Sequence, residues 1–174
     1  DRYIPGLPDP IPLRVYTPHE PAPGERLPIL VYLHGGGWVL GDLETMDHLC
    51  RTLVRHAGIA VVSLDYPLAP ETQFPAVHEA IAAALRDLVA RAPALSLDPA
   101  RLALGGDSAG GNLSAVLALM ARDAGGPDLK ALCLIYPALD LPRYFQGEDW
   151  PEDSLFLRRP TVEWFIDCYL GDRA

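Results

Sequence analysis

Basic residues are scarce in this chain of 174 residues, which has 14 Lys and Arg against 23 Asp and Glu. The formal net charge at pH 7 is −9, and no stripe of Lys and Arg interrupts the acidic background. Nucleic-acid phosphates are bound through clustered Lys and Arg. The composition therefore argues against a nucleic-acid-binding surface.

Long apolar runs and cysteines are scarce as well. No stretch approaches the roughly 18 consecutive apolar residues of a transmembrane helix, and nothing at the start resembles a signal peptide. We therefore expect no membrane span and a cytoplasmic location. Cys50, Cys133 and Cys168 are an odd, widely separated set, which favours reduced thiols over disulfides. No His, Cys and Asp cluster has ligand spacing, so we expect neither a metal nor an organic cofactor.

Apolar residues make up 49% of the chain, enough for one domain with its own core. Strand-like and helix-like segments alternate, which predicts a mostly parallel sheet with helices on both faces. We expect Cys133 in the core, Asp42 or Thr45 as the cap of the first helix, and extended chain near the sheet edge over residues 5–28. The patterns predict strands at residues 27–33, 59–64, 101–105 and 129–136, and helices at 46–56, 77–91, 112–122 and 161–170.

The segment GDSAG at residues 106–110 lies between a predicted strand and a predicted helix. A serine between glycines in such a strand–turn–helix sequence is typical of a nucleophile elbow, where a strained turn holds the hydroxyl clear of its neighbours. The amides that follow the serine lie at a helix N-terminus, where they lack intrahelical partners and can face an oxyanion. The segment makes Ser108 a candidate nucleophile.

A glycine triplet follows an earlier predicted strand, in the segment HGGGW at residues 34–38. Three residues without side chains allow the main chain to approach a substrate with its N–H groups turned inward. Lipases and esterases combine such a loop with GxSxG in this order. The alternative is a flexible loop without a ligand.

These two motifs and the intervening DYPLAPE at residues 65–71 resemble the hormone-sensitive-lipase-like (bacterial family IV) esterases of the α/β-hydrolase fold. The segment PIPLRVY at residues 10–16 also looks like an early strand of that family. One departure is Pro67, where the family commonly has arginine, so any ion pair made by that arginine is missing.

The resemblance implies a role for each residue of the candidate site. Ser108 would be the nucleophile, and the amides of Gly36, Gly37 and Ala109 would form the oxyanion hole. His34 would support the glycine loop instead of acting as a base. The substrate implied is a small acyl ester.

No histidine follows the candidate nucleophile, since the five histidines lie at positions 19, 34, 48, 56 and 78. A serine needs a histidine to take its proton and an acid to orient that histidine, and in this fold both follow the serine. We therefore expect a chain truncated at both ends, lacking the C-terminal strands and part of the cap. Within a partial domain of residues 1–174, the segment 137–174 resembles a cap.

Two roles remain open for the predicted helix at 161–170. Trp164, Phe165 and Tyr169 line the acyl pocket if the helix belongs to the cap. Alternatively, the helix is amphipathic and buries one face on the core. The strand at 129–136 is expected to present an unpaired apolar edge, which a second copy, a complementing chain or a rearranged C-terminal segment would cover.

Two functions follow from these observations. The first is a serine carboxylesterase that hydrolyses short-chain acyl esters through an acyl-enzyme on Ser108. The second is a catalytically impaired fragment or binding module, because no acid and base pair follows the serine. An amidase or peptidase on the same scaffold is a third reading.

Overall fold

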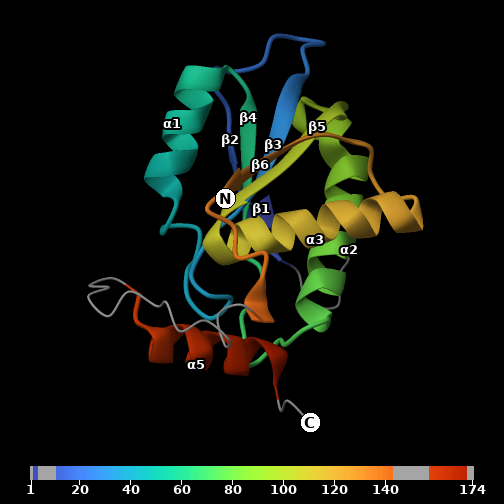
Figure 1. The fold of residues 1–174 in the computed structure, drawn as a ribbon. Coiled ribbons are helices and arrows are strands. Elements are labelled where there is room, and N and C mark those ends of the chain that lie inside the picture. The colour runs from blue at the N-terminus through green and yellow to red at the C-terminus, as the bar shows by residue number, and fades with distance from the viewer. Residues whose placement is uncertain (1, 4–10, 143–156, 172–174) are drawn as a thin grey trace.

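The computed structural model describes residues 2, 3, 11–142 and 157–171 (Figure 1). Its described strands form one six-stranded sheet in the order β1-β2-β4-β3-β5-β6. The pairs β3–β4, β3–β5 and β5–β6 are parallel, and β1–β2 and β2–β4 are antiparallel. The predicted mostly parallel sheet is confirmed. The strands are β1 (Arg2–Tyr3), β2 (Pro12–Tyr16), β3 (Leu27–Leu33), β4 (Ala60–Leu64), β5 (Leu97–Asp107) and β6 (Leu129–Ile135).

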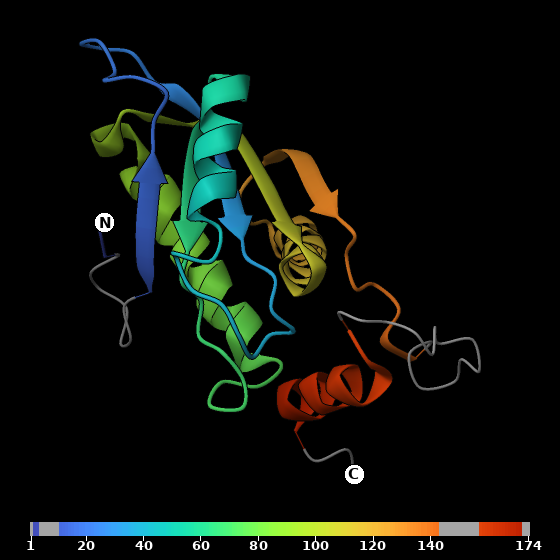
Figure 2. The same cartoon turned by 90° about the vertical axis from the view of Figure 1, so that its left-hand side faces the viewer.

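Helices cover both faces of the sheet. Figures 1 and 2 show α1 (Asp47–Ala57) on one face and α2 (Ala76–Arg91) and α3 (Ser108–Ala124) on the other. A short 3₁₀ helix, η1 (Ala92–Leu95), follows α2. Helix α5 (Arg159–Leu170) lies beyond the carboxyl ends of the parallel strands (Figure 2).

The central strands bury side chains on both faces, as expected for a sheet covered by helices. Alternate residues of a strand point to opposite faces. On β3, Ile29, Val31 and Leu33 belong to the core cluster that includes α2 and α3. Leu30 and Tyr32 belong to the smaller cluster that includes α1. The branched apolar run of β3 therefore serves two cores at once.

The predicted cap of the first helix is wrong. Helix α1 begins at Asp47, and Met46 precedes it without a side-chain cap hydrogen bond. The Asp42 carboxylate instead accepts hydrogen bonds from the amide and the hydroxyl of Thr45, both at 2.8 Å. Short polar side chains readily close such local turns, and here the turn lies two residues before the helix.

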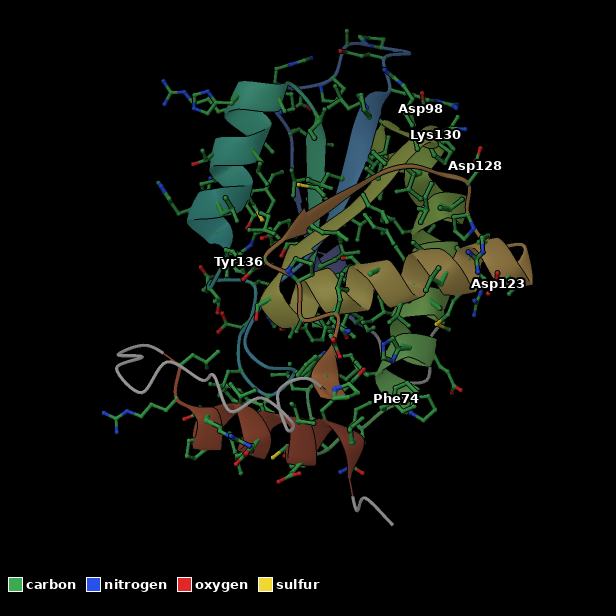
Figure 3. The ribbon with its side chains drawn as sticks, in the orientation of Figure 1. Phe74, Asp98, Asp123, Asp128, Lys130 and Tyr136 are labelled. Carbon is green, nitrogen blue, oxygen red and sulfur yellow. The ribbon has the colours of Figure 1, made fainter. Side chains whose placement is uncertain are left out.

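The predicted burial of Cys133 is also wrong. Its strand, β6, is the last of the described sheet and pairs only with β5 among the described residues. Cys133 is exposed, and Leu132 is 45% exposed. At the start of β6, Lys130 pairs with Asp128 (Figure 3). An apolar edge is thus open in the described structure, as the sequence predicted.

Candidate active site

The turn between β5 and α3 places Ser108 in a strained conformation. Strand β5 ends at Asp107 and α3 begins at the serine, whose φ of 51° is left-handed. Such a conformation costs about 1–2 kcal/mol for a residue with a side chain. The flanking glycines make the turn possible, because a Cβ at Gly106 or Gly110 would lie 2.4 or 2.0 Å from the carbonyl oxygen of Leu33.

The glycine loop after β3 is left-handed over three consecutive residues. The φ angles are 126° at Gly36, 61° at Gly37 and 63° at Trp38. Glycine adopts these angles without steric cost, whereas tryptophan does not. A Cβ at Gly36 would lie 2.0 Å from the carbonyl oxygen of Leu40, so only glycine fits this position of the loop.

A buried carboxylate joins the two motifs. Oδ1 of Asp107 accepts a hydrogen bond from the Tyr32 hydroxyl at 2.9 Å and another from the Gly35 amide at 3.0 Å. Asp107 is only 4% exposed. Burial and the Asp107 charge raise the pKa of Tyr32 well above its usual range, so the hydroxyl keeps its proton. The residue before the serine therefore fixes the start of the glycine loop.

His34 lies at the base of the loop and has no exposed surface. Its Nδ1 is 2.8 Å from the Gly35 carbonyl oxygen, and because a carbonyl only accepts, Nδ1 carries the hydrogen. The ring stacks on Tyr66 with centroids 4.3 Å apart, and the Tyr66 hydroxyl donates to the His34 carbonyl at 2.7 Å. Burial lowers the pKa of His34, which keeps the ring neutral.

The loop that carries Pro67 is held by the backbone. The amide of Ala69 donates to the carbonyl oxygen of Trp38 at 2.9 Å, and the amide of Thr72 donates to that of Leu68 at 2.9 Å. The missing family arginine therefore does not leave this segment without hydrogen bonds.

A cavity of about 860 Å³ opens between the glycine loop, Ser108 and helix α5. Gly36 and Gly37 line it together with the serine. Ala109 is buried directly after the serine in the first turn of α3. Asp107 is the only charged residue among the lining residues that the structure describes. Such a pocket suits an uncharged, mainly apolar ligand.

Helix α5 combines the two roles that the sequence left open. Phe165 lines the cavity with Val162 and Ile166, as a cap residue would. Tyr169 is 3% exposed and stacks on Trp38 instead, and Trp164 is 52% exposed. One residue of the predicted aromatic trio therefore lines the pocket, while another anchors the helix.

No histidine reaches the cavity in the part of the chain that the structure describes. His34 is enclosed beneath the glycine loop, and His78 lies buried on α2, with its Nε2 3.3 Å from the Tyr169 hydroxyl. Neither is among the lining residues. The described residues thus place Ser108 and the glycine loop on one cavity, with no histidine among the residues that line it.

The sequence did not single out Tyr32 or Asp107. Asp107 stands next to the serine in GDSAG, but its hydrogen-bond partners lie more than 70 residues earlier in the chain.

No helix in the described part of the chain is both long and apolar enough to span a bilayer.

Ser108, strained at a strand–helix turn, lines the same apolar cavity as Gly36 and Gly37, an arrangement typical of α/β hydrolases. A family model for the alpha/beta hydrolase fold matches residues 30–174. The chain therefore belongs to this family, and the resemblance to its hormone-sensitive-lipase-like esterases is confirmed.

Individual relatives are esterases by name. The carboxylesterase NlhH of Mycobacterium tuberculosis is 46% identical over 169 residues, which cover 95% of this chain and 51% of that protein. The ethyl acetate hydrolase of Pseudomonas putida is 37% identical over 162 residues, covering 91% of this chain and 50% of that protein. The chain spans about half the length of the curated relatives it matches.

A solved structure shares the arrangement. The hyperthermophilic esterase of the archaeon Pyrobaculum calidifontis superposes with a TM-score of 0.88 at 42% identity. The match covers 99% of this chain and 56% of that one. The likeness in fold thus extends over nearly the whole of the present chain.

Proposed function

We propose that the chain is part of a serine carboxylesterase for short-chain acyl esters. Ser108 attacks the ester carbonyl, the amides of Gly36, Gly37 and Ala109 bind the oxyanion, and water then releases the acid from the acyl-enzyme. His34 holds the glycine loop from below. The observation that carries the proposal is the left-handed serine that opens α3 on the same cavity as the two glycines.

The lining of the cavity supports this substrate class. Apolar side chains from the glycine loop region and α5 surround the serine, so an uncharged acyl group is buried without unpaired charge. The names of the relatives, carboxylesterase and ethyl acetate hydrolase, favour ester hydrolysis over the non-catalytic alternative and over amide hydrolysis.

The acid and the base come from outside the described residues in this proposal. The open edge of β6 is where further sheet would pair, and we infer that a complementing segment or a second copy covers it. Residues 137–174 then form part of a cap within one partial hydrolase domain. A cytoplasmic location stays a prediction.

Reaction of the purified chain with a p-nitrophenyl alkylphosphonate, with imidazole added as the general base that the described residues do not supply, tests the role of the serine. Such a reagent mimics the tetrahedral intermediate and leaves a stable adduct on the nucleophile. We expect one adduct by intact mass, on the peptide that contains Ser108, and none in Ser108→Ala. Equal labelling of both proteins would refute the proposal.

Turnover of p-nitrophenyl acetate and butyrate measures how much catalysis the chain retains. Binding and an oxyanion hole alone leave roughly 10³–10⁴-fold acceleration over water when triad members are removed. We expect the chain alone to remain in that range, with Ser108→Ala close to it, because this residual rate does not pass through the serine. Rapid turnover by the chain alone that is unaffected by Ser108→Ala would refute a reaction through the serine.

A further inference from the structure

Helix α5 contacts the glycine loop at two consecutive loop residues. The Phe165 ring lies against Gly37, where an added Cβ would be 2.3 Å from a ring carbon. One turn later, the Tyr169 ring stacks on Trp38 with centroids 4.5 Å apart and planes 11° from parallel. Residues four apart share one face of a helix. A single face of α5 therefore supports both loop residues.

Trp38 is the loop residue that most needs support. Its φ of 63° is left-handed, and bulky residues persist in that region only where the surroundings hold them. Its side chain is 4% exposed, and its carbonyl accepts the Ala69 amide at 2.9 Å. The left-handed run that ends at Trp38 also sets the direction of the Gly36 and Gly37 amides.

The Tyr169 ring is itself fixed on the core, and is 3% exposed. The Tyr169 hydroxyl lies 3.3 Å from His78 Nε2, and the backbone carbonyl of Tyr169 accepts a hydrogen bond from the Phe74 amide at 2.9 Å. The side-chain amide of Gln73 donates to the Cys168 carbonyl at 3.1 Å. Figure 3 shows Phe74 near the start of α2, above the end of α5. The last turn of α5 is thus anchored and offers the indole a rigid surface.

We propose that Tyr169 is a positioning residue for the oxyanion hole, an inference that rests on the esterase function proposed above. Its ring, stacked on Trp38, keeps Gly36 and Gly37 in the conformation that turns their amides into the cavity. Earlier turns of the same helix line the acyl pocket. The stack therefore couples the binding of an acyl group against α5 to the orientation of the Gly36 and Gly37 amides.

Amide hydrogen exchange tests the effect on the loop without requiring catalysis. The amides of Val39 and Leu40 donate to the Gly36 carbonyl at 3.1 and 2.9 Å and report whether the loop is closed. We expect Tyr169→Leu, which removes the aromatic face, to speed their exchange by about tenfold or more, while amides of β3 stay protected. Tyr169→Phe keeps the stack and should exchange like the unmodified chain.

Two further variants make the comparison decisive. Glu163→Gln changes a partly exposed residue of the same helix, paired with Arg159 at 2.9 Å, and should leave exchange unchanged. If Tyr169→Leu fails to fold, Tyr169→Met retains an unbranched apolar side chain without a planar face and replaces it. Unchanged exchange of Val39 and Leu40 in a folded variant without the ring would overturn the proposal.

Phosphonylation of Ser108 supplies the second readout. We expect the Tyr169→Leu rate constant to fall by about tenfold or more, with Tyr169→Phe and Glu163→Gln close to the unmodified chain. A rate that is unchanged in Tyr169→Leu would contradict the positioning role. If the unmodified chain is not labelled even with imidazole added as an external base, the esterase proposal fails, while the exchange experiment still decides whether Tyr169 holds the loop.

Discussion

The Tyr32→Phe variant removes one hydroxyl and tests whether the candidate site can lose its alignment while the chain still folds. The hydroxyl donates to Asp107 at 2.9 Å, and the same carboxylate oxygen accepts the Gly35 amide. Both side chains are buried, so no solvent replaces the lost donor. Among the residues that the structure describes, the variant leaves the Asp107 carboxylate with the Gly35 amide as its hydrogen-bond donor.

A hydrogen bond to a charged group contributes about 1.5–3 kcal/mol, and we expect Tyr32→Phe to lower the free energy of unfolding by that amount. Because Asp107 fixes the start of the glycine loop, we also expect slower phosphonylation of Ser108. We expect the rate of phosphonylation to fall by about tenfold, which is less than the roughly 10²–10³-fold loss caused by removing one oxyanion donor.

Tyr16→Phe is the matched control. The Tyr16 hydroxyl also donates to a carboxylate at 2.9 Å, that of Asp47, but neither residue lines the cavity. Asp47 keeps Arg14 and Arg51 as partners at 3.3 and 2.6 Å, so the expected loss is about 0.5–1.5 kcal/mol. Phosphonylation should be unchanged. Urea unfolding and labelling rates are measured on both variants, and equal labelling by the two would refute the reasoning.

Three shorter predictions address the rest of the structure. Gly110→Ala should lower the free energy of unfolding by about 3 kcal/mol or more, because the added Cβ would meet the fixed backbone of β3. Gly58 is also left-handed but has open space around it, so Gly58→Ala should lower the free energy of unfolding by only about 1–2 kcal/mol. Similar urea midpoints for the two variants would contradict this prediction. Burial lowers the pKa of His78 from 6.5, so the unfolded chain takes up its proton first and stability is lost as the pH falls below about 6.5. As the pH is lowered from 8 to 5, the urea midpoint should fall less steeply for His78→Gln than for the unmodified chain. Parallel profiles of the two proteins would refute a contribution of His78 to this pH dependence. Leu132→Lys places a charge on the open β6 edge and should reduce self-association in size-exclusion chromatography with light scattering; a wild-type chain that is monomeric at high concentration would refute association through this edge.

The order of strands and helices could be predicted from the sequence because it depends on local patterns. Branched apolar runs produced β3 and β4 within a residue of the predicted ends. Helix α3, in contrast, begins at Ser108, four residues before the helical composition does. Its first turn contains two glycines, which have poor helix propensity, and tertiary contacts hold that turn in place.

The contacts that align the site could not be read from the sequence. The Tyr32 and Asp107 pair spans 75 positions, and the stack of Trp38 on Tyr169 joins a loop to a distant helix. No local signal encodes such pairs. The exposure of Cys133 was missed for the same reason, since its apolar run looks like core and only the sheet order shows that it lies at an edge.

The most direct test of the central claim is a crystal structure of the chain phosphonylated on its nucleophile. The account predicts a phosphorus atom bonded to Ser108 Oγ, with the phosphoryl oxygen about 2.7–3.1 Å from the amide nitrogens of Gly36, Gly37 and Ala109. A phosphoryl oxygen turned to solvent, away from all three amides, would contradict it.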